Sequence, residues 1–367
     1  MRVLNVILVI WALAAVSCGG SQAMSDAEQA TTGAAYLHIT PRDGYTEVRV
    51  DDPWHPDKPM AQYALVPRDS SVIVPDSLTA ISVPLKRCIV YSMVHTAALD
   101  ELGCLDAVVA VADPQFFAPD DPVTERLADG SIASIGSSLS PMIEKIIAIA
   151  PDAIILSPED GVDNAQIHAA GIPVVYMSDY LEHTPLARAE WIKFIGLLTG
   201  REALTDSIYE TVCHEYCGLR DNACATVRRP TVLTERPYMG VWYLPGGASY
   251  KAQLIADAGA SYVYSDNSDT GSLQLSEEAV IAHAGNADIW LLNEQGESSP
   301  DILADRMPHC RAFAAFPNGI YYCDASTSPM FRDIAFHPER VLRDMIYVFH
   351  PELRNGQPLR YYKPLAQ

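Results

Sequence analysis

The chain has 367 residues, of which 49% are hydrophobic and 19% charged, and its 25 basic and 46 acidic residues give a net charge of −21 at pH 7. This composition supplies enough apolar residues for a core and excludes an intrinsically disordered protein. The length suggests about two domains of ordinary size. The strong negative charge argues against a nucleic-acid partner, which would require a basic face.

The N-terminus has the organisation of an export signal. Arg2 is followed by an apolar run over residues 3–16, which is too short to span a bilayer and is typical of a secretory signal. The run ends at Ser17-Cys18-Gly19, which resembles the lipobox of bacterial lipoproteins. We therefore expect a signal peptide over residues 1–17, lipidation of Cys18 and a flexible tether over residues 18–33. An ordinary signal peptide with an incidental cysteine is the alternative.

The cysteines after Cys18 indicate neither a metal site nor a fixed disulfide pattern. There are seven of them, so at least one has no partner cysteine within the chain, and they lie at positions 88, 104, 213, 217, 224, 310 and 323. Cys213, Cys217 and Cys224 have the spacing of successive helical turns rather than that of a zinc knuckle, and we expect no metal there. Cys310 with Cys323 is the pair to test first for a disulfide.

Two kinds of secondary structure are expected in the first half of the chain. Residues 34–82 are predicted to be β-rich, because strand-like runs flank the turn signal Pro41-Arg42-Asp43-Gly44. From residue 83 to 183, strands alternate with helices, which is typical of a parallel sheet covered by helices. The expected strands are 87–91, 108–111, 153–156 and 174–177, and the expected helices are 97–102 and 141–150.

A helical stretch over residues 184–229 separates this region from a second one of the same kind. Thr184 is the expected N-cap, Pro185 the first helical residue and Gly200 the end of the first helix. From residue 230 to 367 the alternation resumes. Strands are expected at 231–233, 238–242, 289–292 and 320–323, and helices at 249–258 and 338–349.

The two α/β regions contain similar sequence patterns. Residues 140–156 and residues 276–292 each predict a capped helix with a glutamate near its start, followed by a buried strand. Glu144 and Glu278 occupy matching places. The repeat favours two equivalent lobes, and chance similarity between such units is the alternative.

No motif indicates catalysis. The sequence has no P-loop, dinucleotide fingerprint, His-Glu-x-x-His or Gly-x-Ser-x-Gly elbow. An exported two-lobed protein of this kind is better interpreted as a receptor that holds a small ligand between its lobes. An exported enzyme is the alternative from another class.

Several segments together resemble a known family. Residues 87–92 with 99–103, 144–156, 171–175 and 254–260 resemble, in order and spacing, the iron-siderophore and vitamin B12 receptors of bacterial ABC importers. The resemblance covers residues 83–348. It implies two Rossmann-like lobes with parallel-rich central sheets, residues 83–183 and 230–367, joined by a long backbone helix within 184–229, with the ligand cleft between the lobes. Residues 34–82 have no counterpart in that family and are expected to pad lobe one or to contact a partner.

The resemblance also implies a biological role. It implies a monomeric, lipid-anchored substrate-binding protein on the extracytoplasmic side of a bacterial membrane, with an ABC permease and its ATPase as partners and no resident cofactor or catalytic residue. Glu144 and Glu278 would dock onto arginines of the permease, and Glu277 is the competitor in lobe two. The ligand would be a ferric siderophore, haem or a corrinoid.

The candidate ligand contacts follow the predicted strands. They are Ser92, Met93, His95, Asp113, Gln115, Phe116, Phe117, Glu159, Asp160, Asp179 and Tyr180 in lobe one, and Trp242, Tyr243, Asp266, Ser268, Asn293, Glu294, Asp324, Ser326 and Phe331 in lobe two. The aromatic rings suit a large flat or partly apolar ligand. His95 could coordinate the metal of haem or a corrinoid, or could form only a local hydrogen bond. These loops hold few Arg or Lys residues, which favours a neutral or cationic ligand over an anionic siderophore.

Two other receptors fit the same pattern. One is a receptor for bare Zn²⁺ or Mn²⁺, which would need His95, His183, Asp179 and Asp324 to converge on one ion. The other is a surface lipoprotein that captures its ligand without a permease.

Overall fold

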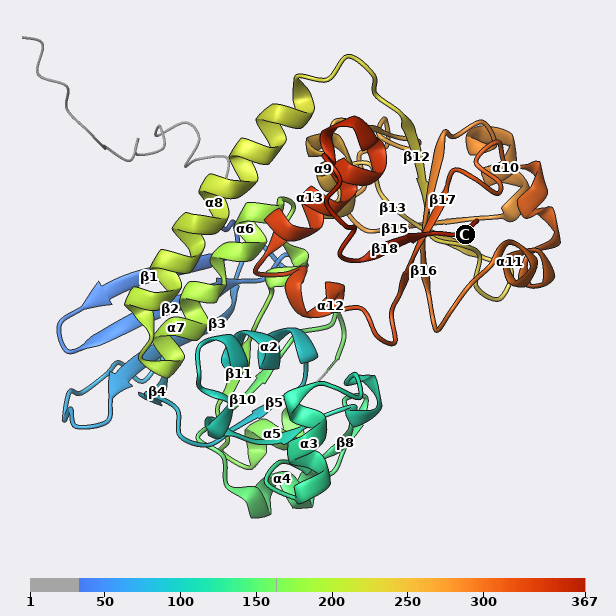
Figure 1. Ribbon diagram of the computed structural model, residues 1–367. Helices are drawn as coiled ribbons and strands as arrows, with labels where there is room; N and C mark the ends of the chain where they lie inside the picture. The colour runs from blue at the N-terminus through green and yellow to red at the C-terminus, as the bar shows by residue number, and fades with distance from the viewer. Residues whose placement is uncertain (1–32, 163, 367) are drawn as a thin grey trace, which may run out of the picture. The chain divides into compact units, whose positions relative to one another are not determined.

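The computed structural model describes residues 33–162 and 164–366 (Figure 1). The predicted signal peptide, lipobox and all but the last residue of the tether lie outside the described residues. The described chain contains a four-stranded sheet and two five-stranded sheets. No disulfide forms among the described residues. Cys310 and Cys323, the pair considered first for a disulfide, are buried free thiols in this structure.

An N-terminal sheet precedes the first lobe. Its strand order is β1-β2-β3-β4, with antiparallel pairs except between β3 and β4. The turn between β1 and β2 has Gly44 at a φ of 83°, a conformation that favours glycine. The strands are β1 (Leu37–Arg42), β2 (Tyr45–Asp51), β3 (Pro59–Pro67) and β4 (Thr79–Val83).

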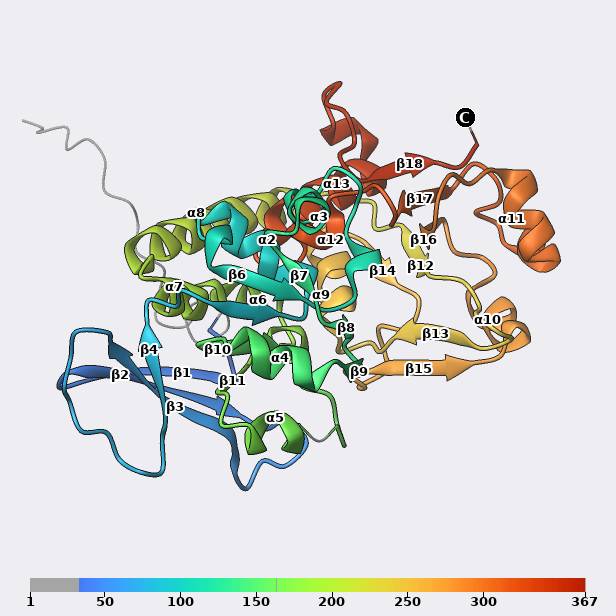
Figure 2. The ribbon, with the colours of Figure 1, turned by 90° about the horizontal axis from the view of Figure 1, so that it is seen from below.

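This sheet is part of the core of lobe one. The Tyr63 hydroxyl donates to the Val174 carbonyl oxygen at 3.0 Å and accepts from the Tyr176 amide at 2.9 Å, which fastens β3 to β11 (Val174–Tyr176). Val48 and Leu65 belong to the same buried cluster as the linking helices. Figures 1 and 2 show the blue sheet beside helix α7. The segment therefore pads lobe one.

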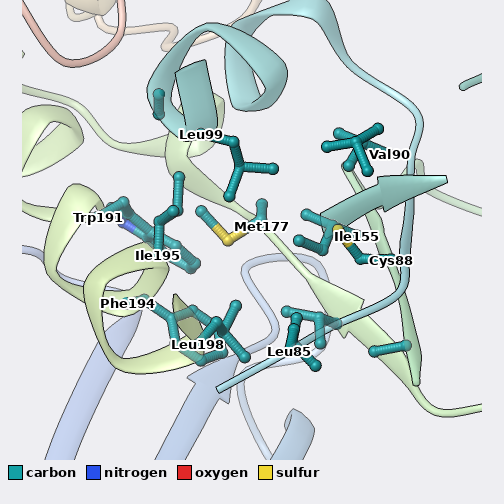
Figure 3. Close-up of a cluster of buried hydrophobic side chains, with 14 of the residues drawn as sticks. Leu85, Cys88, Val90, Leu99, Ile155, Met177, Trp191, Phe194, Ile195 and Leu198 are labelled. Atoms are coloured by element: carbon teal, nitrogen blue, oxygen red, sulfur yellow. The ribbon is translucent and has the colours of Figure 1, made fainter. Parts of the chain in front are cut away.

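The sheet of lobe one is entirely parallel and buried on both faces. Its strand order is β11-β10-β5-β6-β7. Ile155 of β10 points into the cluster with Trp191 (Figure 3), and the adjacent Ile154 packs on the other face with Ile146. This explains why β6 and β10 read as short unbroken apolar runs.

The remaining elements of lobe one match the predicted alternation. Ser92 caps α2, and its Oγ accepts from the Val94 amide at 3.3 Å. The elements are β5 (Cys88–Val90), α2 (Met93–Glu101), η1 (Leu105–Ala107), β6 (Val108–Val111), η2 (Pro114–Phe116), α3 (Pro122–Asp129), β7 (Ala133–Ser134), β8 (Gly136–Ser137), β9 (Ser140–Pro141), α4 (Ile143–Ile149), β10 (Ala153–Leu156), α5 (Ala165–Ala169), β11 and η3 (Asp179–Leu181).

Three helices link the lobes: α6 (Pro185–Glu190), α7 (Ile192–Thr199) and α8 (Glu202–Cys224). Thr184 caps α6 through the Ala187 amide at 3.2 Å, and Gly200 ends α7 in the left-handed conformation. Gly196 allows α7 to approach α8, because a Cβ there would lie 2.1 Å from the Thr205 Oγ1. At 23 residues, α8 is roughly 35 Å long and leads to β12 (Figure 1). The long connecting helix is confirmed.

Lobe two has a largely parallel sheet with the order β14-β12-β16-β17-β18, in which only β18 is antiparallel to its neighbour. Its core is aromatic: the Trp290 ring centroid lies 5.7 Å from that of Trp242 and 4.7 Å from that of Phe313. The elements are β12 (Thr231–Thr234), β13 (Trp242–Pro245), α9 (Tyr250–Asp257), β14 (Ser261–Tyr262), β15 (Ser272–Leu275), α10 (Glu277–Ala284), β16 (Ile289–Glu294), α11 (Pro300–Arg306), η4 (Pro308–Ala312), β17 (Ile320–Asp324), α12 (Met330–Asp333), α13 (Pro338–Phe349), η5 (Pro351–Leu353) and β18 (Tyr362–Pro364).

Two local predictions were wrong. The strand expected at 238–242 begins only at Trp242, because Met239 has a φ of 50° and Gly240 one of 82° in a tight turn. Ser140 does not cap α4: it pairs with Ser137 in the β8–β9 hairpin, and α4 starts two residues beyond Pro141 without a side-chain cap. The equivalent α10 is capped as predicted, by Ser276.

Among the described residues, no helix is long and apolar enough to cross a membrane.

Candidate ligand-binding site

A pocket of about 370 Å³ opens in lobe one where β5, β6 and β10 end. The carboxyl ends of parallel strands meet at one edge of a sheet, and this edge is where open α/β folds bind ligands. The pocket is lined by Tyr91, Ser92, Met93, Ala112, Asp113, Phe116, Phe117, Ser138, Leu139, Leu156, Ser157, Glu159, Val162 and Asn164.

Large apolar side chains of this pocket are exposed to solvent. Phe116 in η2 is 67% exposed, Leu139 at the tip of the β8–β9 hairpin 80%, and Val162 in the loop after β10 53%. They come from three separate segments and meet at one opening. A gathering of exposed apolar groups around a pocket is typical of a surface that another molecule covers.

The charged groups of the pocket are carboxylates. Asp113 and Glu159 line it, and none of its lining residues is Lys, Arg or His. Burial raises the pKa of Asp113, but hydrogen bonds from Ser138 and Gln115 outweigh it and hold this pKa below the usual range. Asp113 also has a φ of 48°, and strained backbone of this kind occurs often at functional sites. The pocket therefore presents negative charge at neutral pH.

Tyr91 offers the pocket an unused hydrogen-bonding group. Its hydroxyl is buried and has no hydrogen-bond partner among the described residues. Burial, and then the Asp113 carboxylate, raise the pKa of Tyr91 to about 12, so the phenol is neutral at physiological pH. A ligand in the pocket can satisfy this group.

The structure brings four of the lobe-one candidates together in the pocket lining: Ser92, Met93, Phe116 and Phe117. Phe117 also belongs to the hydrophobic core. Asp160 is exposed and does not line the pocket.

Two further lobe-one candidates lie beside the pocket rather than in it. The Tyr180 hydroxyl donates to the Pro158 carbonyl oxygen in the loop that carries Glu159. His95 is 1% exposed, and its Nε2 lies 3.0 Å from Asp179 Oδ1. Asp179 Oδ2 accepts from Arg188 Nε at 3.1 Å. His95 is therefore part of a buried polar network and is not placed to coordinate a ligand's metal.

The lobe-two candidates do not line this pocket. Trp242 is fully buried, and its Nε1 donates to the Thr234 carbonyl oxygen at 3.1 Å, so the expectation of a ligand contact there is corrected to a core residue. Tyr243, the next residue of the strand, points the other way and is 44% exposed. Asp266 is exposed after β14, and Phe331 is half-buried on α12.

Sequence reasoning missed a charged cluster where β12 ends. Glu235 and Arg236 follow β12 directly, with Glu235 at a φ of 58°. Glu235 forms an ion pair with Lys251 and accepts from Asn293 Nδ2 at 3.1 Å. Arg236 Nε donates to Glu294 Oε1 at 2.7 Å. The signal was available, because these residues follow a predicted strand as the other candidates do.

The two predicted docking glutamates occupy equivalent positions. Glu144 lies in the first turn of α4 and Glu278 in the first turn of α10, and both are exposed. The competitor Glu277 is half-buried, with its Oε1 3.3 Å from His309 Nδ1. Glu278 is thus the more accessible acid of lobe two.

The residues suggested for a bare metal ion do not converge. The His183 Nε2 lies 3.0 Å from the Tyr36 hydroxyl, whereas the His95 Nε2 lies 3.0 Å from Asp179 Oδ1. Asp324 Oδ1 accepts from the Gly296 amide at 2.9 Å. In residues 33–162 and 164–366, no group of three or more His, Cys, Asp or Glu side chains could hold a metal ion.

Comparison with known families decides the class of protein. Residues 93–320 match the family model described as periplasmic binding protein, a span from α2 in lobe one to the start of β17 in lobe two. The chain belongs to the periplasmic binding protein family. Proteins of this family are substrate-binding proteins, and the resemblance found in the sequence is confirmed.

Solved structures confirm the two-lobed periplasmic binding protein fold. A periplasmic haem-binding protein of Vibrio cholerae is 20% identical, with a TM-score of 0.58 over 72% of this chain and 100% of its own. An ABC-type Fe³⁺-hydroxamate transport protein of Saccharomonospora viridis is 23% identical, with a TM-score of 0.56 over 73% and 94% of the two chains. An uncharacterized lipoprotein of Methanocaldococcus jannaschii is 26% identical over 305 residues, which are 78% of this chain and 70% of the relative.

Proposed function

We propose that this periplasmic binding protein is the lipid-anchored substrate-binding component of an ABC importer. It captures an iron complex, such as a ferric siderophore or haem, or a corrinoid, and delivers it to the permease and its ATPase. In this proposal the protein acts as a monomer on the extracytoplasmic side of the membrane and catalyses no reaction.

The observation that carries the proposal is the lobe-one pocket. It lies at the ligand-binding edge of a parallel sheet, its volume of about 370 Å³ suits a small molecule, and Phe116 and Leu139 leave apolar surface open at its mouth. The names of the structural relatives, one a haem-binding protein and one a Fe³⁺-hydroxamate transport protein, support a metal chelate as the cargo.

The lipid anchor rests on two observations. Cys18 directly follows the export signal, and two relatives from Methanocaldococcus jannaschii are named lipoproteins. We expect Cys18→Ala to abolish labelling by a palmitate analogue and to release the protein from the membrane. A Cys18→Ala protein that is still labelled and membrane-bound contradicts the anchor.

Ligand capture is tested by titrating the full chain in detergent with ferric siderophores, haem and cobinamide while the melting temperature is followed. A ligand that binds only the folded state raises this temperature. We expect Phe116→Ala and Leu139→Ala each to weaken binding about tenfold, as for apolar contacts in a pocket. Ile73→Ala is the matched control, because Ile73 is 94% exposed and does not line the pocket. If none of these compounds raises the melting temperature, the proposed cargo is wrong.

A further inference from the structure

We infer that the lobe-one pocket selects metal chelates that are neutral or positively charged and carry an apolar face, and that it rejects anionic chelates of the same shape. This inference rests on the proposed function and narrows its cargo: haem, which carries two anionic propionates, is disfavoured against a neutral or cationic siderophore complex or corrinoid.

The first argument is the charge of the pocket. Its acidic side chains are Asp113 and Glu159, and no lining residue supplies a positive charge. Asp113 is held in place by the Ser138 amide, which donates to its Oδ2 at 3.1 Å. A carboxylate or sulfonate on a ligand would therefore meet two like charges with no cation to offset them, whereas an ammonium group would be attracted.

The second argument concerns the basic residues that pair with Glu235 and Glu294, the acids at the ends of β12 and β16. Arg236 and Arg306 both pair with Glu294, each at 2.7 Å, and Lys251 pairs with Glu235. Because Glu294 is buried, it needs these partners, and an anionic ligand could recruit the arginines only by leaving a buried charge unpaired.

The residues around the lobe-two strand ends carry no excess of positive charge, and the exposed Asp266 after β14 adds an unmatched acid. The three bases just described are matched by Glu235, Glu294 and the Asp324 carboxylate at the end of β17. If this face covers a bound ligand, it adds no net positive charge. The negative charge of the lobe-one pocket therefore decides the electrostatic selectivity.

The third argument concerns the neutral groups. Phe116, Leu139 and Val162 offer exposed apolar surface, and Tyr91 offers a neutral hydroxyl that lacks a partner among the described atoms. Such a phenol can donate to an amide or hydroxamate oxygen, which needs no formal charge for recognition. The pocket thus matches the periphery of an amide-bearing or hydroxamate chelate.

The test uses three matched pairs of chelates with the full chain in detergent. Ferric desferrioxamine B carries a free ammonium group, and its N-succinyl derivative carries a carboxylate there instead. Cobinamide and cobyrinic acid share the corrin ring but bear amides and carboxylates respectively. Haem and haem dimethyl ester differ only in their propionates. Whichever pair binds, we expect the neutral or cationic member to bind at least about tenfold more tightly, the effect of one charge pair near a protein surface.

The affinities of the same pair of chelates are then measured for the Asp113→Asn and Glu159→Gln variants and for the double variant. Asparagine tolerates the left-handed backbone at position 113, so this variant should fold. We expect the double variant to lose most of the preference between the two chelates, and the wild-type preference to shrink at high salt. Leu139→Ala should weaken both members equally, because it removes apolar contact and no charge.

The possible outcomes distinguish the charge selectivity from the proposed importer function. Equal or tighter binding of the anionic member by the wild-type protein overturns the charge selectivity and leaves the importer function standing. A preference that persists in the Asp113→Asn, Glu159→Gln double variant overturns the assignment of these two carboxylates. Failure of all six compounds to bind overturns the proposed cargo and the selectivity together.

Discussion

His337 of lobe two and Glu101 of lobe one are 236 residues apart in the chain, yet the His337 Nε2 lies 2.7 Å from the Glu101 Oε2. The other ring nitrogen, Nδ1, lies 3.1 Å from Glu339 Oε1. Both nitrogens donate when the ring is protonated, so the two carboxylates favour the imidazolium. A charged histidine between two acids therefore joins α2 of lobe one to α13 of lobe two.

This arrangement predicts that stability depends on pH. Burial lowers the pKa of His337, but hydrogen bonds and ion pairing with Glu101 and Glu339 outweigh it and raise the pKa from its ordinary value of 6.5 to about 9. The stabilisation is fully present below pH 6.5 and is lost as the pH rises toward 9. A shift of this size corresponds to about 3 kcal/mol of unfolding free energy. Urea unfolding at both ends of this range should show the loss in the wild type and not in His337→Gln. His55→Gln, at an exposed histidine, is the control. An unchanged pH dependence in His337→Gln contradicts the assignment.

A second contact between the lobes predicts a large loss of stability. Arg332 on α12 donates to Asp121 and, at 2.8 Å, to Asp100. The Asp121 side chain is fully buried, so Arg332→Ala strands a buried carboxylate and should lower the unfolding free energy by about 3 kcal/mol. Arg343→Ala, which breaks an exposed pair with Glu215, should cost no more than about 1 kcal/mol. Equal denaturation midpoints for the two variants would show that the Arg332 contact does not stabilise the fold.

If Glu144 and Glu278 dock onto the permease, substituting them should impair transport and leave ligand binding intact. The double variant Glu144→Arg, Glu278→Arg reverses two exposed charges, one on each lobe, and should abolish stimulation of the permease ATPase in proteoliposomes. Ligand affinity and stability should change by less than about 1 kcal/mol, because surface substitutions are usually mild. Glu202→Arg, at another exposed glutamate in a first helical turn, is the matched control. Normal stimulation by the double variant would rule out docking at these two residues.

Substitutions of the two neighbouring aromatic residues of β13 should lower stability by very different amounts. Trp242→Ala empties a fully buried site against Trp290 and Phe313 and should cost about 3–5 kcal/mol of unfolding free energy. Tyr243→Ala, at a 44% exposed position, should cost less than about 1 kcal/mol. Chemical denaturation of the two variants checks this, and similar midpoints would contradict the assigned strand register.

The sequence predicted those helices and strands that are specified by short segments of the chain. The helix expected at residues 338–349 has these bounds in α13, which starts at Pro338, and the strands expected at 108–111 and 153–156 are β6 and β10. The residues that follow the lobe-one strands were found for the same reason. Trp242 was wrongly predicted to contact the ligand. Successive side chains of a strand point to opposite faces of the sheet, so the uncertainty in where the strand starts left open which face Trp242 occupies.

The rest of the site depends on contacts that no local pattern encodes. Leu139 reaches the pocket only because the β8–β9 hairpin folds beside the end of β6, and that hairpin has strands of two residues each. The Arg332–Asp100 and His337–Glu101 pairs join residues more than 200 positions apart. Such pairs form because the two lobes pack together. The sequence pattern predicts the fold class but not which side chains meet between the lobes.

The hydrogen bonds of Tyr63 have a practical consequence for dissecting the protein. The family match starts at residue 93, but a truncation placed there would remove the residue whose hydroxyl caps the edge strand β11 and would strip apolar cover from Phe194. The N-terminal sheet is therefore not an accessory module that can be exchanged or trimmed. Any autonomous folding unit made from this chain has to begin upstream of β1.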